Sequence, residues 1–209
     1  MILALETSTR RASLALLDLD SGAVTDERVF TSDRAHNAAI FAPLASLLEG
    51  RRDPLSGIVV GLGPGSYGGV RVGLAVANGL AVALGVPVLG GSSLEAWEVA
   101  PVCHVIVGDA RRGSCFVASI RDRRLQSGPD LVDAGELATH LERLADEGFT
   151  AFSADETIVS AHPRVTLAHP SAARLAQRHR NADFGRDADG PLEPVYLRAP
   201  YITEPKTKS

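Results

Sequence analysis

The segment from residue 70 to residue 84 reads VRVGLAVANGLAVAL, and it restricts the possible folds more than any other part of the chain. Only Arg71 and Asn78 in it are polar, and Gly85 directly behind it is a typical helix-ending residue. A helix that is apolar on every side has to be covered on every side. A sheet of the same chain covers one side only, so the sequence predicts a further neighbour for the other side.

Small residues recur at every fourth position from the residue just before this segment, at Gly69, Gly73, Ala77 and Ala81. They share one face of the helix and form a narrow ridge, which lets a second helix approach closely. The sequence leaves two alternatives for what packs on this ridge. The ridge is covered either by a helix of the same chain or by a helix of a partner protein.

A second apolar helix is expected just before, from about residue 33 to residue 49, with Ser32 as its N-cap. Its apolar residues follow a helical stripe and spread beyond it, so this helix also has apolar surface to spare. We therefore predict that the two helices bind a partner protein. The predicted interface consists of His36, Ile40, Phe41, Leu44, Leu48, Val70, Gly73, Leu74, Ala77 and Ala81.

The loop between the two helices, residues 61–69, reads GLGPGSYGG and fits the dinucleotide-binding pattern GxGxxG. That site also needs an acidic residue after the next strand, and residues 88–92, VLGGS, supply none. A phosphate-binding P-loop needs a lysine, and the only lysines are Lys206 and Lys208. We therefore predict a structural turn with glycines at positive φ. Its central residues are Gly63, Pro64, Gly65 and Ser66.

The order of elements predicts an α/β protein with two related lobes. Three apolar stretches joined by short polar turns predict an antiparallel meander, followed by helix, strand, helix and strand. The second half repeats this order loosely. Such an order is that of the ribonuclease-H-like or actin-like (ASKHA) fold, with mixed sheets flanked by helices and a smaller, degenerate second lobe. We expect an N-terminal lobe with the partner-binding helices over residues 1–100, and a smaller lobe with an extended tail over residues 101–209.

Groups for catalysis or metal binding are not brought together by the sequence pattern. No two of the six histidines are three or four residues apart, so we expect no metal site, and no catalytic residue is assigned. Glu6 and Asp109 each end a predicted strand, where kinases of this fold hold Mg²⁺. They serve either as turn residues or as a vestigial nucleotide site.

The net charge of −4 argues against a protein that binds nucleic acid alone, so any RNA contact is expected to be shared with a partner. Cys103 and Cys115 are expected to lie too far apart along a hairpin for a disulfide, which indicates a reducing cytoplasm. We expect no membrane span, because a helix over residues 72–84 rises only about 20 Å.

Four segments resemble the bacterial TsaB family of threonylcarbamoyladenosine (t6A) biosynthesis proteins. The start, ILALETSTRRASLALLD, is similar to the family opening ILAIDTST…CSVAL. Residues 61–96 resemble the block GxGPGSFTGxRIGxxxAxGLAxxxxxPxxGVSSLxA. Residues 109–113, DARRG, are similar to the DAR-x-GE turn, and residues 194–198, PVYLR, to the C-terminal PxYLR.

This resemblance implies a degenerate actin-like fold and a non-catalytic scaffold without cofactor. Such a subunit binds and activates the catalytic subunit TsaD as a heterodimer, works with the ATPase TsaE, and contacts tRNA only within that complex. It pairs with itself when alone. The first two helices form the interface in this family. The alternative, from the fold only, is a small-molecule kinase or hydrolase.

Overall fold

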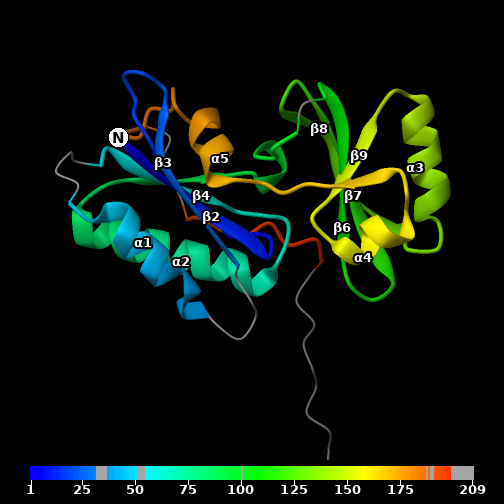
Figure 1. The fold of residues 1–209 in the computed structure, drawn as a ribbon, viewed down its shortest axis with the longest axis horizontal. Helices are drawn as coiled ribbons and strands as arrows, with labels where there is room; N and C mark the ends of the chain where they lie inside the picture. The colour runs from blue at the N-terminus through cyan, green and yellow to red at the C-terminus, as the bar shows by residue number, and fades with distance from the viewer. Residues whose placement is uncertain (32–36, 51–54, 100, 187, 189–190, 199–209) are drawn as a thin grey trace, which may run out of the picture.

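The computed structural model describes residues 1–31, 37–50, 55–99, 101–186, 188 and 191–198. Two five-stranded mixed sheets lie side by side, one in each lobe (Figure 1). The expected two-lobed α/β architecture of the actin-like fold is confirmed.

The first sheet has the strand order β3-β2-β1-β4-β5, in which β1, β2 and β3 are antiparallel and β1, β4 and β5 are parallel. Strands β1 and β4 are buried along their whole length, as their unbroken apolar sequences require. The strands are β1 (Ile2–Glu6), β2 (Arg11–Leu17), β3 (Val24–Thr31), β4 (Gly57–Gly61) and β5 (Val88–Gly91).

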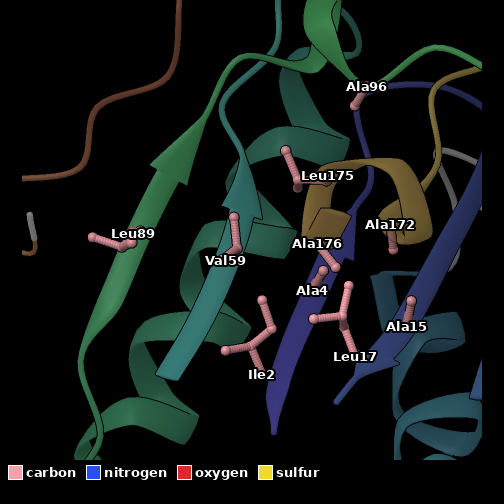
Figure 2. Packing of buried hydrophobic residues seen from close by; sticks show 10 residues of the cluster. All are labelled: Ile2, Ala4, Ala15, Leu17, Val59, Leu89, Ala96, Ala172, Leu175 and Ala176. Carbon is pink, nitrogen blue, oxygen red and sulfur yellow. The ribbon is translucent and has the colours of Figure 1, made fainter. Parts of the chain in front are cut away.

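Helices cover both faces of the first sheet. On one face lie α1 (Phe41–Leu48), preceded by the 3₁₀ turn η1 (Asn37–Ile40), and α2 (Tyr67–Leu84). On the opposite face lies α5 (Ala172–Arg178), which comes from the far end of the chain. Figure 2 shows the core of that face, where short side chains let α5 pack directly on the strands. Its members are Ile2, Ala4, Ala15, Leu17, Val59, Leu89, Ala96, Ala172, Leu175 and Ala176.

The second sheet repeats the topology with the order β8-β7-β6-β9-β10. Its helices α3 and α4 pack on one face and close a second core. The elements are β6 (Cys103–Asp109), β7 (Ser114–Arg121), β8 (Arg124–Asp133), α3 (Leu137–Asp146), β9 (Thr150–Ser153), α4 (Glu156–Ala161) and β10 (Val165–Leu167), after the 3₁₀ turn η2 (Ser93–Glu95).

Several expectations need correction. Strand β8 was not predicted, and in the hairpin of β6 and β7 Cys115 lies opposite Asp109 whereas Cys103 lies opposite Arg121. Both cysteines are free. The first helix is shorter than expected, and part of the predicted range, residues 32–36, lies outside the described residues. Helix α5 follows the second lobe in sequence but packs on the first sheet, whereas the predicted boundary at residue 100 places it with the second lobe.

Candidate partner-binding face and glycine loop

The glycine loop packs against the turn that follows β1, and each contact leaves no room for a side chain. A Cβ atom on Gly61 would lie 2.2 Å from the Glu6 carboxylate, and one on Gly65 would lie 2.2 Å from the Ser8 carbonyl oxygen. The Ser66 N–H also donates to that carbonyl oxygen, at 2.6 Å. The glycines of this loop therefore permit close backbone packing.

The first turn of α2 continues the same contact with Thr7. A Cβ atom on Gly69 would lie 2.2 Å from the Thr7 carbonyl oxygen, and one on Gly73 would lie 2.3 Å from Thr7 Oγ1. Thr7 Oγ1 donates to the Gly69 carbonyl at 2.9 Å. Ser66 caps the helix by accepting the Gly69 N–H at 3.2 Å. The Thr7 contacts thus decide which face of α2 lies inward.

The loop itself matches a strand-to-helix turn. Gly63 has φ of +87°, a conformation that a side chain disfavours. Its N–H donates to Ser93 Oγ at 3.0 Å, and the bond between Gly63 and Pro64 is cis. Both residues are buried, whereas Gly65 and Ser66 are exposed, so the first part of the loop faces the protein and its middle faces solvent.

Glu6 lies under this loop and is completely buried. Its Oε1 accepts the N–H of Ser8 at 2.8 Å. Burial raises the pKa of the Glu6 carboxyl above its ordinary value, while hydrogen bonds from Ser8 and Ser93 act in the opposite direction. The carboxyl is therefore closed to a nucleotide in this conformation.

Asp109 holds the equivalent position at the end of β6 but lies at the surface. It accepts the Arg111 N–H at 2.7 Å and forms an ion pair with the Arg111 guanidinium at 2.8 Å. Each of the two carboxyl groups is thus engaged within its own lobe. This arrangement fits turn roles better than a shared nucleotide site.

The predicted interface residues separate into two groups. Five are buried within this chain and cannot touch a partner: Ile40, Leu44, Val70, Gly73 and Ala77. This part of the prediction is wrong, because Ile40, Leu44 and Ala77 pack in the core of the first lobe, while Gly73 lies against Thr7 and Val70 against Gly63. Phe41 is 58% exposed, while Leu48, Leu74 and Ala81 are half-buried. His36 lies outside the described residues.

A second small-residue ridge on α2 faces outward, and the sequence analysis missed it. Ala75, Gly79 and Ala83 recur at every fourth position and are exposed. A Cβ atom on Gly79 would meet nothing within 4 Å. The signal was present, since these residues have the same spacing as the buried ridge.

Val82 lies on the same side of α2 as the outward ridge, and Leu84 is the last residue of the helix. Val82 is 86% exposed and Leu84 is 50% exposed. By length and composition alone, helix α2 could cross a membrane. Core helices of soluble proteins meet the same criterion. Only Val70, Gly73 and Ala77 of its 18 residues are buried. The exposed face therefore consists mostly of small and apolar residues, with Arg71 and Asn78 as its polar members.

At the start of α2 the exposed surface becomes aromatic. The Tyr67 and Tyr196 rings lie 5.5 Å apart, and the Arg71 guanidinium lies 4.7 Å from the Tyr67 ring centre. Such contacts orient both tyrosines at modest energetic gain. They bring the C-terminal segment next to α2.

Comparison with known protein families identifies the family to which this chain belongs. A family model described as TsaD, tRNA N6-adenosine threonylcarbamoyltransferase, matches residues 31–172, more than half of the chain. The chain belongs to this family. Within it the chain is TsaB/YeaZ-like, as its relatives and its solved structural neighbours show.

An uncharacterized protein of Mycobacterium tuberculosis is 31% identical over 207 residues, covering 95% of this chain and 92% of the relative. The tRNA threonylcarbamoyladenosine biosynthesis protein TsaB of Bacillus subtilis is 35% identical over 127 residues, 55% of this TsaB/YeaZ-like chain and 52% of the relative. The match therefore spans about half the length of that TsaB.

A crystal structure of an uncharacterized Pseudomonas aeruginosa protein with similarity to peptidase YeaZ has the same fold. Its TM-score is 0.67 at 24% identity, and the alignment covers 94% of this TsaB/YeaZ-like chain and 99% of that protein. A likeness at this identity concerns the fold alone.

Proposed function

We propose that this chain acts in t6A biosynthesis as a non-catalytic scaffold that binds and activates a TsaD-like catalytic subunit. The TsaB relatives carry t6A biosynthesis in their names, which supports the pathway. The open apolar face of α1 and α2 supports the scaffold role. We call the exposed residues Ala75, Gly79, Val82 and Ala83 the α2 outer face; Phe41 of α1 is an exposed apolar residue of a helix that packs against the same core.

The exposure of this face is the single observation that carries the proposal. Val82 and Phe41 are among the most exposed large apolar residues of the described chain. Burying apolar surface contributes about 25 cal/mol per Å², so a facing helix gains from covering them. The small residues at 75, 79 and 83 let that helix come close. We therefore expect a helix-to-helix contact.

The assembly follows from the same surface. Alone, the chain pairs with a second copy through the α2 outer face; with a TsaD-like subunit present, it exchanges into the heterodimer. A TsaE-like ATPase completes the complex, and tRNA touches this chain only there, in keeping with its net charge of −4. The proposed location is the cytoplasm, with no membrane attachment.

The chemistry of this chain fits a helper better than a catalyst. The Glu6 carboxyl is buried and Asp109 pairs with Arg111, which favours structural roles over Mg²⁺ binding for both. The alternative, a small-molecule kinase or hydrolase, requires ATP binding and turnover by this chain alone. Calorimetry with ATP and Mg²⁺ tests it.

Charges placed on the α2 outer face test the proposal. Ala75→Glu and Gly79→Arg add a charge where no side chain stands in the way, so the fold survives but pairing fails. Ala138→Glu, an exposed alanine of α3, is the matched control. We expect both α2 variants to lose co-purification with a TsaD-like subunit and the control to keep it. Retained pairing by the α2 variants would reject this surface.

A t6A assay extends the test to function. We expect tRNA modification by a TsaD-like and a TsaE-like protein to need this chain and to fail with Gly79→Arg. Full modification without the chain would reject the scaffold role.

A further inference from the structure

The last described segment, residues 191–198, runs from the first lobe to the second (red in Figure 1). At its beginning, Leu192 packs with the core of the first lobe, close to Gly90. The Val195 N–H then donates to the carbonyl oxygen of Leu62, just past β4, at 2.8 Å. The segment is thus fastened to the first lobe by packing and by a backbone hydrogen bond.

The end of the segment is fastened to the second lobe. Leu197 packs with the core cluster that includes Ile106 and Phe116. The Arg198 guanidinium donates to Ser114 Oγ, at the first residue of β7, at 2.7 Å. Consecutive residues therefore bind opposite sides of the junction between the lobes.

Two other chain segments that connect the lobes lie next to each other and are joined by backbone hydrogen bonds. Residues 96–98 and 169–171 run side by side. The Glu98 N–H donates to the carbonyl oxygen of His169 at 3.0 Å, and the Ser171 N–H donates to the carbonyl oxygen of Ala96 at 2.9 Å. A junction made of two adjacent chain segments is a geometry about which packed domains can turn. The C-terminal segment holds other residues of each lobe, so it restricts that turn.

We propose that residues 192–198 are a clamp that sets the angle between the lobes, and that Tyr196 links this clamp to the partner on α2. The Tyr196 side chain is exposed and lies against Tyr67, the first residue of α2. A partner that extends to the start of α2 meets Tyr196 as well. The clamp stands on the chain's own contacts, and its link to the partner rests on the proposed function.

A distance measurement between the lobes tests the clamp without any partner. Spin labels are placed at Val29→Cys in β3 and Thr139→Cys in α3, both exposed, with Cys103→Ser and Cys115→Ala removing the native thiols. Double electron–electron resonance then gives the distribution of lobe-to-lobe distances.

Two clamp variants and one matched control are compared. Leu197→Asp removes the apolar anchor, and a chain ending at Gly190 removes the clamp. A chain ending at Arg198 keeps the clamp and is the control. We expect one narrow distribution for the unshortened chain and the control, and a distribution at least about twice as broad for both clamp variants. A narrow distribution in a folded Leu197→Asp chain would overturn the clamp, even if the shorter chain does not fold.

Hydrogen exchange tests the link to the partner. Adding a TsaD-like subunit is expected to slow exchange of the Val195 amide about tenfold, because a partner that holds Tyr196 disfavours release of the clamp. In Tyr196→Ala the slowing is lost while binding persists through the α2 outer face. Equal slowing in both chains would overturn the link. Failure to bind at all would count against the proposed function and leave the distance result standing.

Discussion

The two lobes share one strand order but differ in how their helices meet solvent. In the second lobe, α3 is sharply divided, with Leu137, Leu141 and Leu144 buried and charged residues outside. In the first lobe, α2 has small or apolar residues on both faces. The second lobe thus presents a charged helix face to water, whereas the first lobe leaves a largely small and apolar helix face exposed. What differs is the outer face, since both helices bury their inner face in the usual way.

The acidic residues that end the two equivalent strands β1 and β6 also differ in their exposure to solvent. Glu6 is sealed beneath the glycine loop, whereas Asp109 lies at the surface beside Arg111. The first lobe therefore uses the loop for packing between its elements. The second lobe leaves its corresponding turn open.

The largest effect is expected when a charge enters the inner face of α2. Ala77 is fully buried, so Ala77→Glu should remove more than about 4 kcal/mol from the free energy of unfolding. Ala75→Glu, two residues earlier on the outer face, should change it by less than about 0.5 kcal/mol. Urea unfolding followed by circular dichroism measures both. Equal effects would break the distinction between the two faces.

A single methyl group tests the contact that orients α2. Gly73→Ala places a carbon against Thr7 Oγ1 and should cost about 1–3 kcal/mol in unfolding free energy. In a Thr7→Ala background the cost should be smaller, because the obstructing oxygen is gone. Thermal melts of the four chains give this coupling. Additive effects would show that Thr7 does not orient the helix.

The two carboxyl positions are expected to differ in pH dependence. Because the folded-state pKa of Glu6 is raised, its contribution to stability is complete below the unfolded value of 4.5 and is lost as pH rises through the folded pKa. Glu6→Gln should therefore gain stability relative to the unsubstituted chain as pH rises above 4.5, as urea midpoints would show. Asp109→Asn loses an exposed ion pair worth less than about 1 kcal/mol. A Glu6→Gln chain that loses relative stability over this range would contradict the expected shift.

The smallest effect sharpens the description of the outer face. Gly79→Ala should stabilise the dilute, unpaired chain by about 0.5–1 kcal/mol, because alanine favours a helix and the site is open. Calorimetric melting at low protein concentration detects it. A loss of stability would show that another part of this chain covers the face.

Local patterns predicted most elements of both lobes. Strand β8 escaped prediction because Arg124–Asp133 contains Gly128 and Pro129 and is largely exposed, so its apolar residues show no alternation. Register shifts at Val117 and Ser119 interrupt its pairing with β7. The return of α5 to the first sheet was not predicted either, because contacts between distant segments leave no periodic signal.

The sequence by itself determined that α2 is a helix with too little polar surface, and that the loop before it needs glycine. Only the tertiary structure decided which ridge lies inward, because Gly73 and Gly79 both fit a small-residue pattern. Helical periodicity defines faces but not their orientation. Thr7 lies against the ridge that contains Gly73 and leaves the ridge that contains Gly79 exposed.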